Sequence, residues 1–172
     1  YHTEHLLLSK KIDVFPSIFG ELNIGSYKTQ SVKLIKFCWD TIRIVIFYAL
    51  PVFVSSKFLF SKHEKKTFLN LVNSDYIISK GGSFICNNLD VRSKIALLRL
   101  LYIFLLSFKL KKKVIILNQS IGPVYGKHSI KLVNYILSKC DQVVLRENNC
   151  IDEYQYLRFP KNTIISNDIA FF

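Results

Sequence analysis

The sequence predicts an α/β fold built on a Rossmann-like parallel sheet with flanking helices. Its clearest strand covers residues 114–117, an apolar run without the polar alternation of a half-exposed strand. Similar short runs lie near positions 76, 142 and 163, and helical patterns separate the later ones. Strands that alternate with helices indicate repeated βα units with right-handed crossovers. We therefore expect these four segments to be parallel neighbours in one sheet.

The predicted helices are recognised by apolar residues that recur at helical spacing. Ser31 is suited to cap a helix that begins at Val32, because its hydroxyl can accept a hydrogen bond from a free amide of the first turn. Residues 100–108 are interpreted as a core helix beside the sheet. Helices are expected at about 32–50, 100–108, 129–139 and 151–157, and weaker strand signals occur at 4–8 and 12–15.

Composition limits the number of domains and the classes of partner. The chain has 172 residues, half of them apolar, which is enough for one domain with its own core. Lys and Arg total 24 against 12 acidic residues, and the formal charge of +12 suits a polyanion, an anionic membrane surface or a phosphorylated small molecule. Zinc-finger spacings and the aromatic box of RNA-binding modules are absent from the sequence, so nucleic acid is not an expected partner.

A membrane span is the first alternative to weigh for the apolar region around residues 44–54. The uncharged run between Arg43 and Lys57 is shorter than the roughly 18 to 20 residues that cross a bilayer, and Pro51 interrupts it. We interpret this run as a buried or interfacial helix. A second alternative is peripheral contact, with residues 100–108 lying on an anionic membrane surface and the lysines of 109–113 near the headgroups.

The cysteines indicate a reducing compartment. Cys38, Cys86, Cys140 and Cys150 are far apart, and no leader peptide precedes them, so a cytoplasmic location is expected. Cys86 and Cys140 are interpreted as small buried hydrophobic residues, and none of the four is assigned a reactive role. The sequence also offers no cluster of residues at metal-ligand spacing, so no metal site is expected.

The expected site lies where the predicted strands end. In open α/β sheets, ligands bind beyond the carboxyl ends of the strands, where glycine turns let a backbone approach closely. A tight turn without a ligand is the alternative for Gly81-Gly82, and an ion pair with a neighbouring acid is the alternative for Arg146. The candidate substrate-binding residues are Gly81, Gly82, Gln119, Ser120, Gly122, Arg146, Glu147 and Asp168, and we expect the first two to approach residues 120–123.

Four motifs together resemble the polysaccharide pyruvyl transferase family. They are SDYIISKGG at 74–82, QSIGP at 119–123, VLRE at 144–147 and DIAF at 168–171, in the order in which that family carries them. Each motif alone is weak, and the ordered set is more specific. The resemblance covers about residues 70–172.

The resemblance implies both a fold and a reaction. Members look like two Rossmann-type domains that face each other across a cleft, as in GT-B glycosyltransferases. They transfer a pyruvyl group from phosphoenolpyruvate to a sugar diol, forming a ketal on a cell-surface polysaccharide or its lipid-linked precursor. Phosphoenolpyruvate would be the donor substrate, and no further cofactor is expected. The transfer reaction would take place in the cytoplasm, and the inner face of the membrane is one location for it.

The sequence also departs from the family pattern. A G-N-x-G-D-like turn is expected near the start, and Asn23-Ile-Gly25 lacks both the preceding strand and the acid. Cys150 stands where Ser is usual. The chain stops just after the DIAF motif, so residues 1–172 are interpreted as an incomplete amino-terminal domain that is inactive by itself. A non-catalytic basic domain that binds an anionic membrane surface or a phosphorylated or nucleotide ligand is the alternative function.

Two side chains are weighed for catalysis. Arg146 is the candidate catalytic residue, since a guanidinium at the end of a strand can grip the carboxylate or phosphate of the donor. His128 is expected to be an exposed residue in the first turn of a helix, because the donor-binding His of the family is expected in the second domain.

Overall fold

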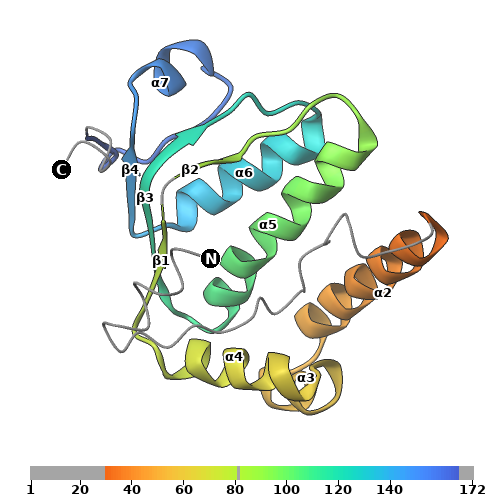
Figure 1. Cartoon of the computed structure of the whole chain (residues 1–172). Helices are drawn as coiled ribbons and strands as arrows, with labels where there is room; N and C mark the ends of the chain where they lie inside the picture. Colours follow the sequence, from red (N-terminus) through yellow and green to blue (C-terminus); the bar gives the residue numbers. More distant parts are fainter. Residues whose placement is uncertain (1–29, 81, 167–172) are drawn as a thin grey trace, which may run out of the picture. The chain divides into compact units, whose positions relative to one another are not determined.

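The computed structural model describes residues 30–80 and 82–166, and the fold is drawn in Figure 1. The chain divides into two compact units, residues 1–73 and 74–172, which are described separately. The prediction of a single domain stays a prediction. The strand signals at 4–8 and 12–15 lie outside the described residues.

In its described part, the first unit is helical. Its helices are α2 (Gln30–Ala49), α3 (Val52–Leu59) and α4 (Lys62–Asn73). The predicted helix at 32–50 is thus confirmed, and it ends because Pro51 has no amide hydrogen and its ring disfavours a helical residue before it. Pro51 instead begins α3 with extended backbone angles, φ −55° and ψ 142°. Within the described residues, no helix is both long and apolar enough to cross a bilayer.

Three phenylalanine rings and Leu71 are the buried hydrophobic side chains described in this unit. Phe47 comes from α2, Phe60 from the link after α3, and Phe68 from α4. Their ring centroids lie 4.9 to 6.1 Å apart. Such aromatic pairs add about 0.5 to 1.5 kcal/mol beyond the area that they bury.

The second unit carries the predicted parallel sheet. The four predicted segments are neighbours in the order β1, β3, β4 and β5, and every pairing is parallel, which confirms the prediction. A further strand, β2, continues β1 along the same edge of β3. The bounds are β1 (Tyr76–Ser79), β2 (Gly82–Ile85), β3 (Lys113–Ile121), β4 (Gln142–Leu145) and β5 (Ile164–Ile165).

Two helices, α5 (Val91–Lys109) and α6 (Lys127–Lys139), pack side by side on one face of this sheet (Figure 1). Leu101 and Phe104 of α5 belong to the same buried cluster as Val114 and Ile116 of β3, which confirms the core helix at 100–108. This burial leaves those side chains unavailable to a membrane surface. Asp90 caps α5 by accepting the Ser93 amide at 2.8 Å. Hydrogen bonding from the Ser93 side chain and then from its amide lowers the pKa of the Asp90 carboxyl.

The last predicted helix is shorter than expected. Helix α7 covers only Asn149–Glu153, whereas the sequence pattern extended through Leu157. Tyr154 leaves the helical region at φ −112° and ψ 56°, since its ring packs beside Gly122. Leu157 is buried in the following turn rather than on a helix face.

Candidate active site at the carboxyl ends of the strands

Strand β3 is interrupted where the candidate site begins. Its pairing with β4 shifts register between Ile116 and Gln119, and Asn118 lies in the left-handed region at φ 46°. Asn is among the residues that tolerate this conformation best. The β1 pairing also ends at Ile116, and β2 takes over at Gln119. Bulges of this kind re-aim side chains and are frequent beside active sites.

Gln119 joins the strands at this interruption. Its side chain is only 1% exposed. The side-chain amide donates to Ser79 Oγ at 3.2 Å and to the Lys80 carbonyl at 3.5 Å, while the Gln119 carbonyl accepts the Arg146 amide at 3.2 Å. The side chain therefore supplies hydrogen bonds where the ladder between β1 and β3 has ended. Contact of Gln119 with a substrate stays a prediction.

Ser120, in the last two residues of β3, forms a connected polar group with Arg146 and Glu147, which follow β4. The Ser120 hydroxyl donates to Glu147 Oε1 at 2.7 Å. Arg146 donates to the same oxygen through Nε at 3.3 Å and through Nη2 at 3.1 Å. The ion pair considered for Arg146 is therefore present, and its partner is Glu147. The pair is partly exposed, so it does not prevent the guanidinium from meeting a ligand.

The turn after Ser120 has room only for glycine. Gly122 has φ +101°, and a Cβ built on it would lie 2.5 Å from Cδ2 of Tyr154. The Gly122 amide donates to the Ile85 carbonyl at 2.9 Å. Gly82 begins β2 and pairs with Gln119, whereas Ile85 at the end of β2 meets the turn. Gly81 lies outside the described residues, so the approach of Gly81-Gly82 to residues 120–123 stays a prediction.

Asn87 fixes the following segment and was not anticipated from the sequence. The backbone amide of Asn87 donates to the Pro123 carbonyl at 3.0 Å. Its side-chain oxygen accepts the Tyr125 backbone amide at 2.7 Å, and its side-chain nitrogen donates to the Tyr125 carbonyl at 3.0 Å. Tyr156 adds a hydroxyl that accepts the Val124 amide at 3.1 Å. A polar residue two positions after the end of β2 was the available signal for Asn87. Residues 123–125 are therefore held by hydrogen bonds to Asn87 and to Tyr156.

The cysteines and His128 lie mostly as expected. Cys140 is buried, and burial raises the pKa of its thiol to about 12. Cys150 is also buried, and its Sγ accepts the Ile121 amide at 3.4 Å. Cys86 is only half-buried, so its predicted burial is less complete. His128 is exposed in the first turn of α6, as predicted.

Two predicted site residues, Gly81 and Asp168, lie outside the described residues. The others gather at the carboxyl edge in two groups. Gly82 contributes backbone at the start of β2 and Gly122 in the turn after β3, whereas Ser120, Arg146 and Glu147 contribute exposed or partly exposed polar atoms. A guanidinium can bind an anion in bidentate fashion, and a carboxylate can accept hydrogen bonds from hydroxyl groups. Ser120, Arg146 and Glu147 can therefore bind a ligand, or a pair of ligands, that carries both an anionic group and hydroxyl groups.

Comparison with known proteins identifies a family over the whole chain. A family model described as "Polysaccharide pyruvyl transferase" matches residues 1–172. No curated protein and no solved structure gives a significant match.

Proposed function

Because the chain belongs to the polysaccharide pyruvyl transferase family, we propose that it takes part in transferring a pyruvyl group from phosphoenolpyruvate to a saccharide diol. The observation that supports this proposal most directly is the group formed by Ser120, Arg146 and Glu147 at the carboxyl edge of the sheet. It combines a cation suited to the donor with oxygen acceptors suited to sugar hydroxyls. Phosphoenolpyruvate is the proposed donor, and no further cofactor is invoked.

The proposed reaction makes one ketal and releases one phosphate. A proton adds to the methylene carbon of phosphoenolpyruvate, and one acceptor oxygen bonds to the neighbouring carbon C2. The bond from C2 to the phosphate oxygen breaks, and the second acceptor oxygen bonds to C2. The two hydroxyl protons lost by the diol balance the proton gained at carbon and the proton carried by inorganic phosphate. The chain's residues would hold the reactants during these steps, since positioning lowers the barrier of such additions.

In this proposal Arg146 holds an anionic group of the donor. Its guanidinium lies beside Glu147, which keeps the planar group oriented through Nε and Nη2. Glu147 in turn is held by the Ser120 hydroxyl, and its carboxylate would accept a hydroxyl of the acceptor. Charge-assisted hydrogen bonds of this kind contribute about 1.5 to 3 kcal/mol each. We place the reaction in the cytoplasm, at the inner face of the membrane where the saccharide is lipid-linked.

Binding of the donor tests this assignment. Phosphoenolpyruvate is titrated into the 172-residue chain and followed by its phosphorus resonance. Arg146→Ala should weaken binding by about tenfold or more, because it removes charge-assisted hydrogen bonds. Arg158→Ala is the control, since Arg158 is an exposed arginine outside the group formed by Ser120, Arg146 and Glu147. Circular dichroism checks that both variants remain folded. Equal affinity of Arg146→Ala and the unsubstituted chain would contradict the proposed role.

A further inference from the structure

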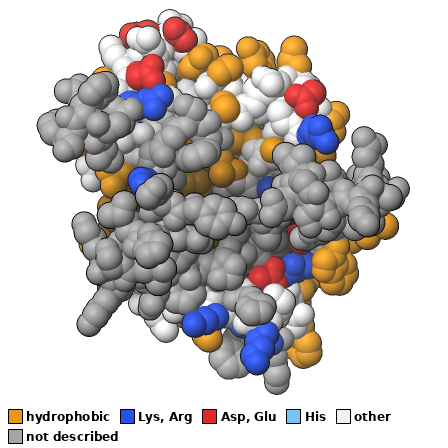
Figure 2. Space-filling view, viewed as in Figure 1, with side chains coloured by type: hydrophobic (Ala, Val, Ile, Leu, Met, Phe, Trp, Pro, Cys, Tyr) orange, Lys and Arg blue, Asp and Glu red, His pale blue; other side chains and the backbone are white. Residues whose placement is uncertain are grey.

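Helix α2 presents a row of large apolar side chains to solvent. Ile35 is 69% exposed, Trp39 58% and Val45 63%, and Ile42 lies between them on the same face. Their spacing of three or four residues places them in one stripe along the helix. Val54 and Phe58 of α3, four residues apart, are exposed as well. We call these six side chains the apolar stripe; hydrophobic side chains lie at the surface over α2 in Figure 2.

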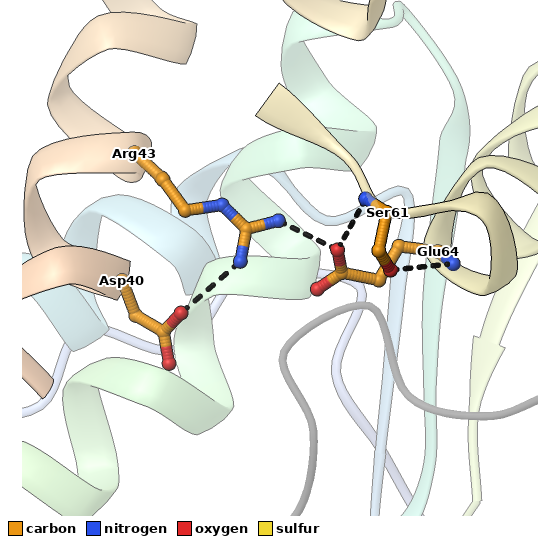
Figure 3. Close-up of polar contacts among 4 residues, drawn as sticks. All are labelled: Asp40, Arg43, Ser61 and Glu64. Atoms are coloured by element: carbon orange, nitrogen blue, oxygen red, sulfur yellow. Dashed lines mark hydrogen bonds and ion pairs between the residues drawn. The ribbon is translucent and has the colours of Figure 1, made fainter. Parts of the chain in front are cut away.

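A buried polar network on the other face of α2 fixes which way the stripe points within this unit (Figure 3). Arg43 donates to Asp40 at 3.2 Å and to Glu64 of α4 at 2.7 Å. Glu64 also accepts the Ser61 amide at 2.8 Å, which completes a capping box at the start of α4. Burial by itself would raise the pKa of Glu64, but the bonds from Arg43 and Ser61 outweigh it and leave the pKa below its ordinary value.

The orientation follows from helix geometry. Asp40, Arg43 and Phe47 are buried and lie at spacings of three and four, so they form the inward face of α2. At about 100° per residue, the mean direction of the exposed side chains on α2 lies roughly 130° from that of these three buried residues. Trp39 is at the edge of the exposed row, since it points only about 40° away from Arg43, whereas Ile42 points about 100° away. The network that binds α2 to α4 therefore holds the stripe on the outward face of the same unit.

The charges around the stripe are almost all positive. Between residues 30 and 73 the chain has seven basic and two acidic residues, a net charge of +5. The two acids are Asp40 and Glu64, and both are bonded to Arg43. The basic residues other than Arg43 are Lys33, Lys36, Lys57, Lys62, Lys65 and Lys66. No carboxylate in the described part of this unit is thus exposed, whereas Lys62 and Lys65 are.

We propose that the apolar stripe docks on the surface of an anionic lipid bilayer, with α2 and α3 lying in the plane of the membrane. Helices that bind in this way combine an apolar face with cationic residues and insert their apolar side chains at the boundary between headgroups and acyl chains. Tryptophan is favoured at that depth. A bilayer is favoured over a protein partner because the charge is of one sign.

Trp39 makes the proposal directly measurable, because it is the single tryptophan of the chain. The full 172-residue chain is mixed with vesicles of phosphatidylcholine alone or with added phosphatidylglycerol. We expect the anionic vesicles to shift the Trp39 emission to shorter wavelength and to allow quenching by lipids brominated on the acyl chain. Raised salt should weaken this binding, since the electrostatic part is screened. Neutral vesicles should bind the chain more weakly.

Two variants and one control distinguish binding through the apolar stripe from non-specific binding by other surfaces. Ile42→Asp and, independently, Phe58→Asp should lower vesicle partitioning by about tenfold or more. Each variant places a charge where the bilayer would otherwise bury apolar surface. Leu89→Asp changes a large apolar residue outside the stripe that is nearly as exposed as Phe58, at 73% against 78%, and should leave partitioning unchanged. Circular dichroism and thermal unfolding confirm that each variant is folded. Trp39 fluorescence measures membrane binding, whereas the phosphoenolpyruvate titration measures donor binding. A negative result with vesicles would therefore leave the proposed reaction unaffected.

Three results would overturn the proposal. Trp39 that stays unquenched by brominated anionic lipids would show that the stripe does not enter a bilayer. Equal quenching in Ile42→Asp would assign any binding to another surface. A dimer in sedimentation that Ile42→Asp dissociates, without lipid binding by the unsubstituted chain, would assign the stripe to a second copy of the chain.

Discussion

At the residue scale, the candidate site depends on side chains whose roles differ more than their positions suggest. Gln119 and Ser120 are adjacent, but their environments differ. Gln119 is buried and its side chain hydrogen-bonds Ser79 of β1, whereas Ser120 donates to Glu147 at the surface. Successive residues of a strand face opposite sides, so neighbours in one motif can serve structure and function separately. Sequence reasoning placed both at the strand end but could not assign these separate environments.

Gly122→Ala should destabilise the protein by about 1 to 3 kcal/mol or more, because an L-residue at this backbone conformation is strained. The new methyl group would also lie 2.5 Å from the Tyr154 ring. Gly126→Ala is the matched control: its φ of +93° carries similar strain, but its Cβ would meet only the flexible end of the Lys94 side chain, with Cε at 3.4 Å and Nζ at 3.7 Å. Urea unfolding measures both. Equal losses in the two variants would show that the Tyr154 contact is unimportant.

Cys140 should be inert towards alkylation in the folded protein at pH 8. Burial, together with the charge of Asp141, raises the pKa of its thiol to about 12, so the reactive thiolate is scarce. Cys38 is exposed and should react under the same conditions. Iodoacetamide labelling with mass spectrometry of peptides compares the two. Rapid labelling of Cys140 without unfolding would contradict its burial.

At the scale of elements, the strands were predictable and their interruption was not. Unalternated apolar runs mark strands that are covered on both faces or lie deep in a sheet. The run at 142–145 coincides with β4, whereas β3 extends beyond the predicted 114–117 to Ile121, so the polar residues expected in a turn belong to the strand. The bulge at Asn118 involves one residue, which an apolar pattern cannot locate. The early end of α7 likewise depends on contact between Tyr154 and Gly122, which are far apart in the sequence.

The start of α4 should be sensitive to acid. The folded-state pKa of Glu64 is lowered, so its bonds stabilise the fold above its ordinary pKa of 4.5 and are lost as pH falls through the lower folded value. Glu64→Gln keeps the size of the side chain but removes the charge that Arg43 binds. We expect the stability difference between the two proteins to be largest near neutral pH and to shrink below about pH 4.5. Urea unfolding at several pH values measures it, and a constant difference would contradict the assigned role.

Helix capping at Ser61 gives a second measure of the same element. Ser61→Ala removes the hydroxyl that accepts the Glu64 amide at 3.4 Å, and losing such a cap costs about 0.5 to 2 kcal/mol. Ser138→Ala is the control, because the Ser138 hydroxyl donates within its own helix to the Tyr135 carbonyl. Thermal unfolding should show a loss for Ser61→Ala only. Similar melting of both variants would indicate that the box contributes little.

At the scale of the whole molecule, the family was recognisable from four short motifs, although these cover only about residues 70–172. The family model extends the match to residues 1–172, including the helical unit in which no motif was found. Amphipathic helices such as α2 and α4 keep their pattern of apolar and polar positions with many different residues, so single short motifs are uninformative there. The comparison with half of a GT-B fold stays a prediction.

The last prediction concerns activity and follows from the two-domain architecture that the family resemblance implies. If the donor is held between two domains, residues 1–172 would supply one wall of that site, including Arg146 and Glu147. Positioning of reactants accounts for roughly 7 to 11 kcal/mol of a barrier, so one wall should be almost inert rather than merely slow. We expect the 172-residue chain alone to release no phosphate from phosphoenolpyruvate in the presence of a saccharide acceptor. A complete two-domain relative is the positive control in the phosphate-release assay, and turnover by the chain alone would show that the site is built within these residues.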